Sequence, residues 1–306
     1  MTVAMGTRCP LCGGWQVEGV VTANIYHELF GCEACGHVFV PLAALDAEEN
    51  QKMQLQYFGK AFSARNGLFV CLYERINARR TARALGRERC QRVLEIGPGS
   101  GAVMAWFARL GHNISGLDMS PAVARQIECR WGLPVTVASL DAHIRAVGEG
   151  VYDVIVMRHV LEHFTDPYEA LLNTYALLKP GGRLYVAVPN TASWHKRFQG
   201  WSGYQPYHFH YFNHQSLSFA LSRAGFRVTG VTSYESLTGW VNTFLYSFVC
   251  QKRVGVSAEV SKGGCKRQLL ETVRLATGIF LSPVRWFQSL LGRGEELVAV
   301  GEKAAG

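Results

Sequence analysis

The sequence predicts an α/β protein built on a doubly wound sheet of seven strands. From Arg92 onward, short apolar runs alternate with stretches of helical periodicity. The first of these runs ends in a glycine-rich turn, Gly97 to Gly101, of the kind that joins a strand to a ligand-binding helix. Ahead of the sheet, two Cys-x2-Cys pairs predict a small metal-binding unit.

The first unit is predicted from four cysteines, Cys9, Cys12, Cys32 and Cys35, in two pairs separated by 19 residues. Four thiolates with this spacing fit one tetrahedral Zn²⁺, and a glycine after each pair permits a tight turn. Strands are expected between Val17 and Phe30 and again after the second pair. We therefore predict a zinc ribbon over residues 1–45, acting as a docking or lid module without chemistry of its own.

Residues 46–90 are predicted to be a helical cap or linker, because apolar positions such as Leu72, Ile76 and Leu85 recur at helical spacing. Tyr57 and Phe58 in this segment are candidates for contact with a ligand. Packing of these two rings against the sheet is an equally good interpretation.

The remaining chain, 91–306, is predicted to form the sheet domain. A ligand site is expected at the carboxyl ends of its parallel strands. The expected strands are 92–96, 113–117, 134–138, 152–157, 183–188, 226–233 and 296–300, and the expected helices are 102–110, 121–131, 166–178 and 214–225.

An insertion before the last strand, residues 237–291, is predicted to be helical, with a break at Pro283. Between residues 250 and 293 the sequence contains eight basic residues and only two acidic ones, Glu259 and Glu271. An amphipathic helix of this kind suits a peripheral contact with an anionic membrane, a lid or a dimer interface, and the pattern leaves all three open. One apolar face is expected to carry Leu270, Val273, Ile279, Phe280, Trp286, Phe287 and Leu290.

The glycine-rich turn fits two kinds of ligand site. Gly97, Gly99 and Gly101 satisfy a dinucleotide fingerprint, and Asp118 at the end of the next strand suits ribose hydroxyls in either case. Glu95 just before the turn favours a cationic ligand, because a carboxylate there would repel a pyrophosphate.

Further motifs follow the glycine-rich turn along the chain in a fixed order. The motif E-x-G-x-G-x-G at 95–101 is followed by YDVI, HVLEH and DP within 152–167, and then by LKPGG at 178–182. This order resembles the class I S-adenosylmethionine (SAM) methyltransferases that act on small molecules, over roughly residues 90–235. The resemblance implies a Rossmann-like methyltransferase sheet, with its last strand antiparallel beside the sixth.

The resemblance also implies roles for individual residues. Glu95 and the three glycines would surround the methionine part of SAM, and Asp118 would hold the ribose. Adenine contacts would come from Met119, Ser139 and Leu140. Many relatives carry an acid where this chain has Ser139, so a backbone N–H is the alternative hydrogen-bond donor to adenine there.

Two histidines are candidate catalytic residues. Methyl transfer is mainly a matter of positioning, and a base is needed only if the acceptor must lose a proton. His159 follows the fourth strand, at the edge where methyl group and acceptor should meet, whereas His163 and Glu162 are expected to buttress the turn. In the segment 207–212, His208 is favoured over His210 as the pocket-facing side chain, since alternate residues of an extended segment face opposite ways.

The expected function is methyl transfer from SAM to a small molecule, such as a sugar, a glycan precursor or a secondary metabolite. An RNA methyltransferase with a zinc knuckle and a non-catalytic SAM-binding scaffold are the alternatives. Nucleic acid is disfavoured, despite a net charge of +8, because the basic residues do not gather in the ribbon. Nine cysteines without a recognisable signal peptide predict a cytoplasmic protein, with contact at the inner membrane face left open.

Overall fold

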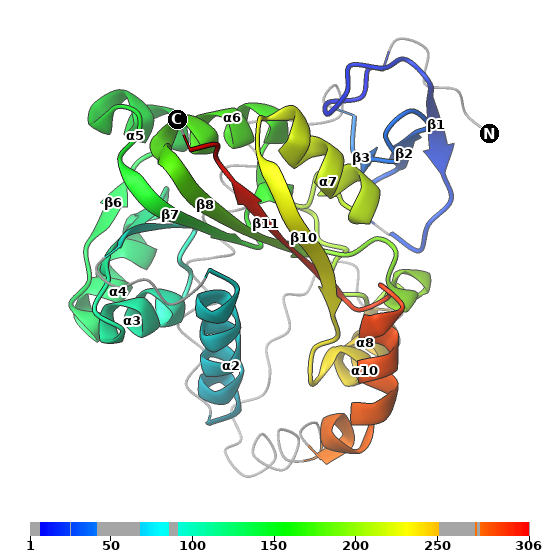
Figure 1. The fold of residues 1–306 in the computed structure, drawn as a ribbon. Coiled ribbons are helices and arrows are strands. Elements are labelled where there is room, and N and C mark those ends of the chain that lie inside the picture. Colours follow the sequence, from blue (N-terminus) through cyan, green and yellow to red (C-terminus); the bar gives the residue numbers. More distant parts are fainter. Residues whose placement is uncertain are drawn as a thin grey trace.

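The computed structural model of this chain describes residues 7–24, 26–41, 68–85, 91–250, 273 and 276–305. Seven strands form the central sheet, in the order β10-β11-β8-β7-β4-β5-β6 (Figure 1). Strands β6, β5, β4, β7 and β8 are parallel to their neighbours, whereas β11 runs antiparallel between β8 and β10. The doubly wound sheet and the antiparallel last strand are thus confirmed. The strand bounds are β4 Arg92–Ile96, β5 Asn113–Asp118, β6 Val135–Val137, β7 Tyr152–Arg158, β8 Leu178–Pro189, β10 Arg227–Tyr234 and β11 Glu296–Glu302.

Helices cover both faces of the sheet because successive strand residues point to opposite sides. Val93 and Val154 belong to one apolar core with α2, α3 and α4, whereas Leu94 and Ile155 belong to the other with α5, α6 and α7. The helices are α2 Leu68–Leu85, α3 Ala102–Arg109, α4 Pro121–Trp131, α5 Leu140–Val147, α6 Pro167–Leu177, α7 His214–Arg223, α8 Gly239–Cys250 and α10 Ser282–Leu290, with 3-10 turns at η2 Leu161–His163 and η3 Trp194–Arg197.

Local capping signals explain where several helices begin. The side chains of Ser120, Asp166 and Asn213 each accept a hydrogen bond from a backbone N–H in the first turn of α4, α6 and α7. Ser139 caps α5 in the same way, and this helix was missing from the sequence-based expectation. Strand β8 is also longer than expected, because it begins at Leu178 and includes the LKPGG segment.

The N-terminal ribbon contains β1 Val17–Val20, β2 Leu29–Cys32 and β3 Val38–Phe39. Its sheet continues into the rest of the chain, since β3 pairs antiparallel with β9, His210–Tyr211. Apolar ribbon side chains such as Leu11 also share a core with the central sheet. The ribbon is therefore built onto the segment that precedes α7, which the sequence did not predict.

The insertion before β11 places α8 and α10 side by side beyond the end of β10 (Figure 1). Trp240 Nε1 of α8 donates to Gln288 Oε1 of α10 over 2.9 Å. Pro283 occupies the first turn of α10, consistent with the break expected there. None of the described helices combines the length and the apolar character needed to cross a bilayer.

Candidate functional site

The glycine-rich turn leaves the carboxyl end of β4 in a left-handed backbone conformation. The φ angles of Gly97, Gly99 and Gly101 are 65°, 54° and 73°, which only glycine adopts without strain. A Cβ on Gly97 would lie 2.4 Å from a methyl carbon of Val160, so a side chain is excluded there on steric grounds as well. The backbone of this turn is consequently fixed close to the segment that follows β7.

Glu95 lies beneath this turn and is 3% exposed. Its Oε2 has no hydrogen-bond partner among the described residues. Burial raises the pKa of Glu95 to about 8, although the charge of Arg158 acts in the opposite direction. A buried carboxyl oxygen without a partner fits a site for a cationic group, such as the ammonium or sulfonium of SAM.

Asp118 ends β5 on the neighbouring side of the turn. Its Oδ1 accepts a hydrogen bond from the Ser120 backbone N–H over 2.8 Å, which orients the carboxylate. Burial raises the pKa of Asp118 to about 6. The carboxylate thus stands at the strand end where hydroxyls of a ribose would be held.

The three predicted adenine contacts lie at the ends of β5 and β6. Met119 is 47% exposed next to Asp118, whereas Leu140, the first residue of α5, is buried in the core. The Ser139 hydroxyl accepts a hydrogen bond from the Ala142 N–H over 3.2 Å. Because this hydroxyl caps α5, the backbone of Ser139 is the better candidate for contact with a base.

His159 has a φ of 53° and is the only non-glycine residue with positive φ in the described part of the chain. Its Nε2 lies 3.0 Å from Glu296 Oε1 and its Nδ1 lies 3.5 Å from Glu162 Oε1. A side chain held in an unfavourable backbone conformation between two carboxylates is a candidate functional position.

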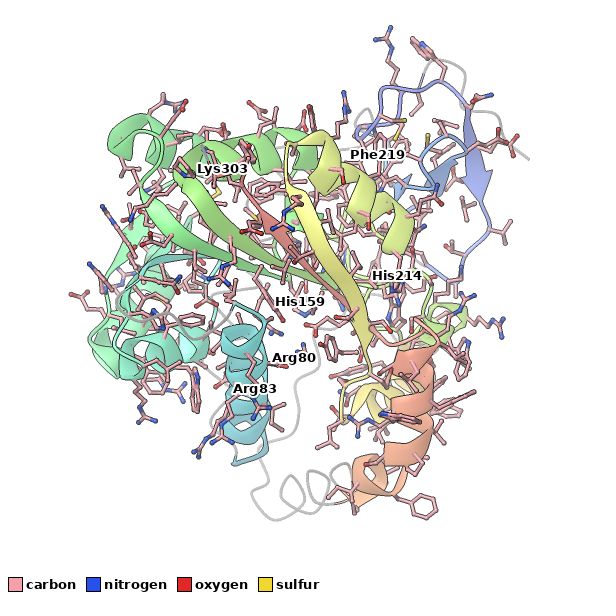
Figure 2. The ribbon with its side chains drawn as sticks, in the orientation of Figure 1. Arg80, Arg83, His159, His214, Phe219 and Lys303 are labelled. Carbon is pink, nitrogen blue, oxygen red and sulfur yellow. The ribbon has the colours of Figure 1, made fainter. Side chains whose placement is uncertain are left out.

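Glu296 joins three elements at this edge of the sheet. Arg158 Nη2 lies 2.9 Å from Glu296 Oε1, and Arg80 of α2 pairs with the other carboxylate oxygen. Figure 2 shows Arg80 on α2 and His159 at this edge of the sheet. Sequence reasoning missed Glu296, because it stands 137 residues beyond His159 and belongs to no motif. The antiparallel course of β11 brings its first residue to the carboxyl ends of the parallel strands, opposite Pro189.

Glu162 is fully buried beneath His159. Burial alone would raise the pKa of Glu162, but the neighbouring rings of His159, His163 and His208 lower it to about 2. His163 Nδ1 lies 2.9 Å from the Tyr207 carbonyl and its Nε2 lies 3.0 Å from the His159 carbonyl. Both ring nitrogens of His163 therefore face backbone acceptors, which fits the buttressing role expected for it.

His208 and His210 point to opposite sides of the segment that precedes α7, as alternation predicts. The His208 ring lies 4.8 Å from the His163 ring, and its Nδ1 lies 2.8 Å from the Gly203 carbonyl. Burial lowers the pKa of His208 to about 3. His210 instead contacts His37 of the ribbon, with 3.0 Å between their ring nitrogens. His208 is thus a neutral, buried neighbour of the His159 turn.

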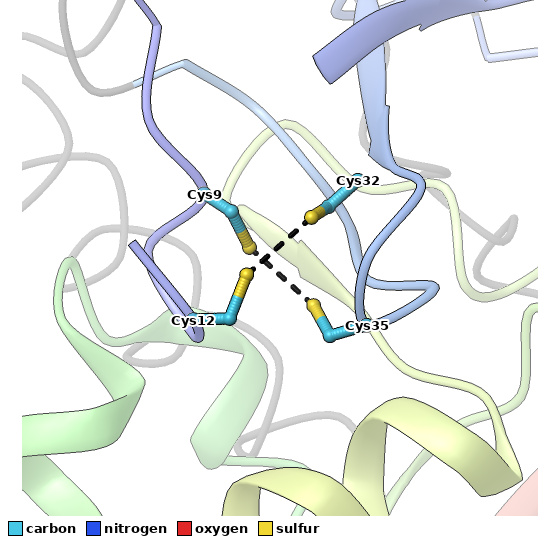
Figure 3. Close-up of side chains that lie close together, drawn as sticks. All are labelled: Cys9, Cys12, Cys32 and Cys35. Atoms are coloured by element: carbon cyan, nitrogen blue, oxygen red, sulfur yellow. Dashed lines mark hydrogen bonds between the residues drawn. The ribbon is translucent and has the colours of Figure 1, made fainter. Parts of the chain in front are cut away.

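The four ribbon cysteines converge on one point (Figure 3). The Sγ atoms of Cys9 and Cys35 lie 3.5 Å apart, as do those of Cys12 and Cys32, and all four fall within 4.8 Å of one another. Four sulfur donors at these separations fit a single tetrahedral Zn²⁺ with bonds of about 2.3 Å. Such a closed set supports a structural ion, since every coordination position is taken by protein.

Tyr57 and Phe58 lie outside the described residues.

Comparison with known proteins agrees with this geometry. The chain matches the profile of a methyltransferase domain family over residues 72–231. It is 33% identical over 104 residues to a ubiquinone biosynthesis O-methyltransferase of Pseudomonas aeruginosa (strain UCBPP-PA14), covering 33% of this chain and 45% of that protein. The match to the enzyme of the same name from Vibrio parahaemolyticus is 32% over 105 residues, covering 33% and 44%. The chain spans less than half the length of these relatives.

Solved structures share the fold at lower identity. A SAM-dependent methyltransferase from Archaeoglobus fulgidus is 18% identical, with a TM-score of 0.51 over 75% of this chain and 94% of that one. The 1,6-didemethyltoxoflavin-N1-methyltransferase of Burkholderia thailandensis, solved with 1,6-didemethyltoxoflavin and S-adenosylhomocysteine, is 18% identical. Its TM-score is 0.52, and the match covers 88% of this chain and 96% of that one.

Proposed function

We propose that this chain, which belongs to the methyltransferase domain family, is an enzyme that transfers the methyl group of SAM to a small molecule. The observation that carries the proposal is the unpartnered, buried carboxyl oxygen of Glu95 under a glycine turn, with Asp118 at the end of the next strand. A cationic ligand with a ribose satisfies both carboxylates. A dinucleotide would leave Glu95 facing a pyrophosphate.

The division of work in the cofactor site follows from these positions. Glu95 offers a negative charge to the methionine part, and the turn from Gly97 to Gly101 admits the ligand close to the backbone. Asp118 accepts from ribose hydroxyls, while Met119 and the backbone at Ser139 border the adenine. When bound, SAM supplies a methyl group that is already activated by its sulfonium, so the protein contributes mainly position.

His159 is the proposed residue at the transfer position. Its ring is fixed by Glu296 and Glu162, so it can hold a proton released by a hydroxyl or amine acceptor. His208, the second candidate from the sequence, is assigned a positioning role, because it is 6% exposed and packs against His163.

The acceptor class is inferred from both sequence and relatives. The names ubiquinone biosynthesis O-methyltransferase and 1,6-didemethyltoxoflavin-N1-methyltransferase both refer to small molecules. Within that class, a sugar, a glycan precursor or a secondary metabolite remains our proposal for this chain. A cytoplasmic location is proposed with it.

Zinc is proposed to occupy the four-cysteine site and to act structurally. The ribbon shares its apolar core and a strand pairing with the main domain, so an ion there would stabilise the wall of the domain next to the His208 segment.

The function is tested by incubating the protein with methyl-labelled SAM and fractionated cell extract. Label is expected in the small-molecule fraction, and Glu95→Gln should reduce its incorporation. Glu128→Gln, a change of the same kind at an exposed position of α4, should not. Label confined to RNA would support an RNA methyltransferase instead. SAM binding without any labelled product would support a scaffold.

A further inference from the structure

Helix α10 turns polar side chains toward the protein and apolar side chains toward the outside, the opposite of the usual arrangement for a surface helix. Its polar residues face the protein: Gln288 is fully buried and donates to Glu235 Oε2 over 2.8 Å. Arg285 donates to the backbone carbonyls of Ser236 and Glu235 over 2.9 and 3.0 Å. The helix is therefore anchored through hydrogen bonds, and its apolar side is left for something outside the described protein.

Large apolar side chains are exposed on α10 and on the helical residues 276–280 that precede it. Phe280 is 83% exposed, Trp286 67%, Leu290 63%, Ile279 59% and Phe287 54%. Phe248 on the adjacent α8 is 71% exposed. We call these six side chains the α8–α10 apolar face. Side chains of this size scattered singly need no explanation, but six gathered on neighbouring helices mark an interaction surface.

The segment that includes this face has a net positive charge in the sequence. Residues 236–294 contain eight basic residues, Lys252, Arg253, Lys262, Lys266, Arg267, Arg274, Arg285 and Arg293, against the acids Glu259 and Glu271. Next to α8, η3 adds the exposed Lys196 and Arg197, and Phe198 of the same segment packs on Trp240. An apolar face within a basic segment complements a surface that is apolar inside and anionic outside.

We infer that the α8–α10 apolar face binds the surface of an anionic lipid bilayer, with its aromatic rings at the level of the headgroups. Trp and Phe on one side of a helix, within a segment rich in Lys and Arg, are the composition of helices that lie in a membrane interface. A second copy of the chain is a poorer occupant, because pairing this segment with itself would bring two net charges of the same sign together. An anionic bilayer attracts the positive charge of this segment, and its acyl region buries the apolar side chains.

The test is flotation of the full-length protein with vesicles of phosphatidylcholine alone or mixed with phosphatidylglycerol. The triple variant Phe280→Ser, Trp286→Ser, Phe287→Ser removes part of the face at exposed positions and should leave the fold intact. The matched control, Trp15→Ser, Val21→Ser, Phe219→Ser, removes three exposed apolar residues from the ribbon and α7. Thermal unfolding of all three proteins checks that they are folded.

Wild type and control are expected to float with anionic vesicles and to dissociate at high salt. The triple variant should bind at least about tenfold more weakly, since three aromatic side chains no longer enter the interface. The inference is overturned if wild type does not float, if neutral vesicles bind it equally, or if the triple variant binds like the control. Concentration-dependent self-association of wild type that the triple variant loses, without flotation, would assign the face to a second copy. Methyl transfer is not read out, so this outcome is independent of the proposed function.

Discussion

At the scale of single residues, acidic side chains define the candidate site: Glu95 and Asp118 beside the glycine turn, and Glu296 against His159. Glu95, the glycines and Asp118 sit within 24 residues of one another, in a pattern that backbone geometry and charge impose. Glu296 meets His159 only because β11 returns antiparallel through the sheet. No local pattern around Glu296 signals that contact.

The pKa of Glu95 gives a prediction with a definite sign. Its folded value of about 8 lies above its ordinary value of 4.5. Ionisation in the folded state therefore costs stability, and this cost grows as pH rises from about 4.5 to 8. Glu95→Gln should stabilise the ligand-free protein by about 1–3 kcal/mol at pH 8, and by much less at pH 5.

The same substitution should weaken SAM binding by roughly tenfold or more, because the counter-charge for the cation is lost. Denaturant unfolding at the two pH values and calorimetric titration with SAM measure the two effects. Equal stability of the variant and wild type at both pH values would show that ionisation of Glu95 does not destabilise the folded protein.

Two glutamates on one strand allow a matched test of the Glu296 network. Glu296→Gln leaves Arg80 and Arg158 without their carboxylate in a largely buried setting, so unfolding free energy should fall by about 3 kcal/mol. Glu302→Gln breaks only an exposed pair with Arg227 and should cost under about 1 kcal/mol.

Activity should follow the same order if Glu296 positions His159: Glu296→Gln loses kcat, whereas Glu302→Gln keeps it. Urea unfolding and initial rates with a methyl acceptor provide the measurements. A Glu296→Gln enzyme with unchanged kcat would leave that glutamate a purely structural role.

At the scale of elements, helix and strand periodicity predicted most of the central sheet and two features escaped it. Helix α5 begins at Ser139, where a serine cap and apolar residues at Leu140, Ile144 and Val147 do give a helical signal. The resemblance assigns Ser139 and Leu140 only adenine contacts, and no helix is predicted there. The pairing of β3 with β9 joins segments about 170 residues apart, and two-residue strands carry no periodicity to find.

The shared core of the ribbon and the sheet predicts how the protein responds to loss of metal. Chelation, or Cys32→Ser, should lower the melting temperature of the whole chain, because Leu11, Phe30 and Phe39 pack in the same core as Leu217 and Phe212. Cys129→Ser, at an exposed cysteine of α4, should leave zinc content and melting temperature unchanged.

Zinc content by elemental analysis and melting by calorimetry check this together. A ribbon that melts separately while the main transition stays in place would contradict the shared core. A protein that contains no zinc and has the same melting temperature would contradict a structural zinc ion.

At the scale of the whole molecule, the alternation of strands and helices determined the architecture, and the edge where the carboxyl ends of the strands meet determined the site. Elements from distant parts of the chain meet there: α2 through Arg80, β7 through Arg158 and β11 through Glu296. The apolar helices α8 and α10 are attached at the same edge through Glu235, which follows β10. Their outward apolar side could be expected from helical periodicity, but the direction in which it faces required the structure.

Isothermal titration of the full-length protein with SAM and, separately, with NAD⁺ shows whether the glycine turn and its two carboxylates form a SAM site. We predict one SAM bound per chain, no binding of NAD⁺, and loss of SAM binding by roughly tenfold or more in Asp118→Asn. Binding of NAD⁺ in place of SAM, or SAM affinity unchanged in Asp118→Asn, would contradict the account.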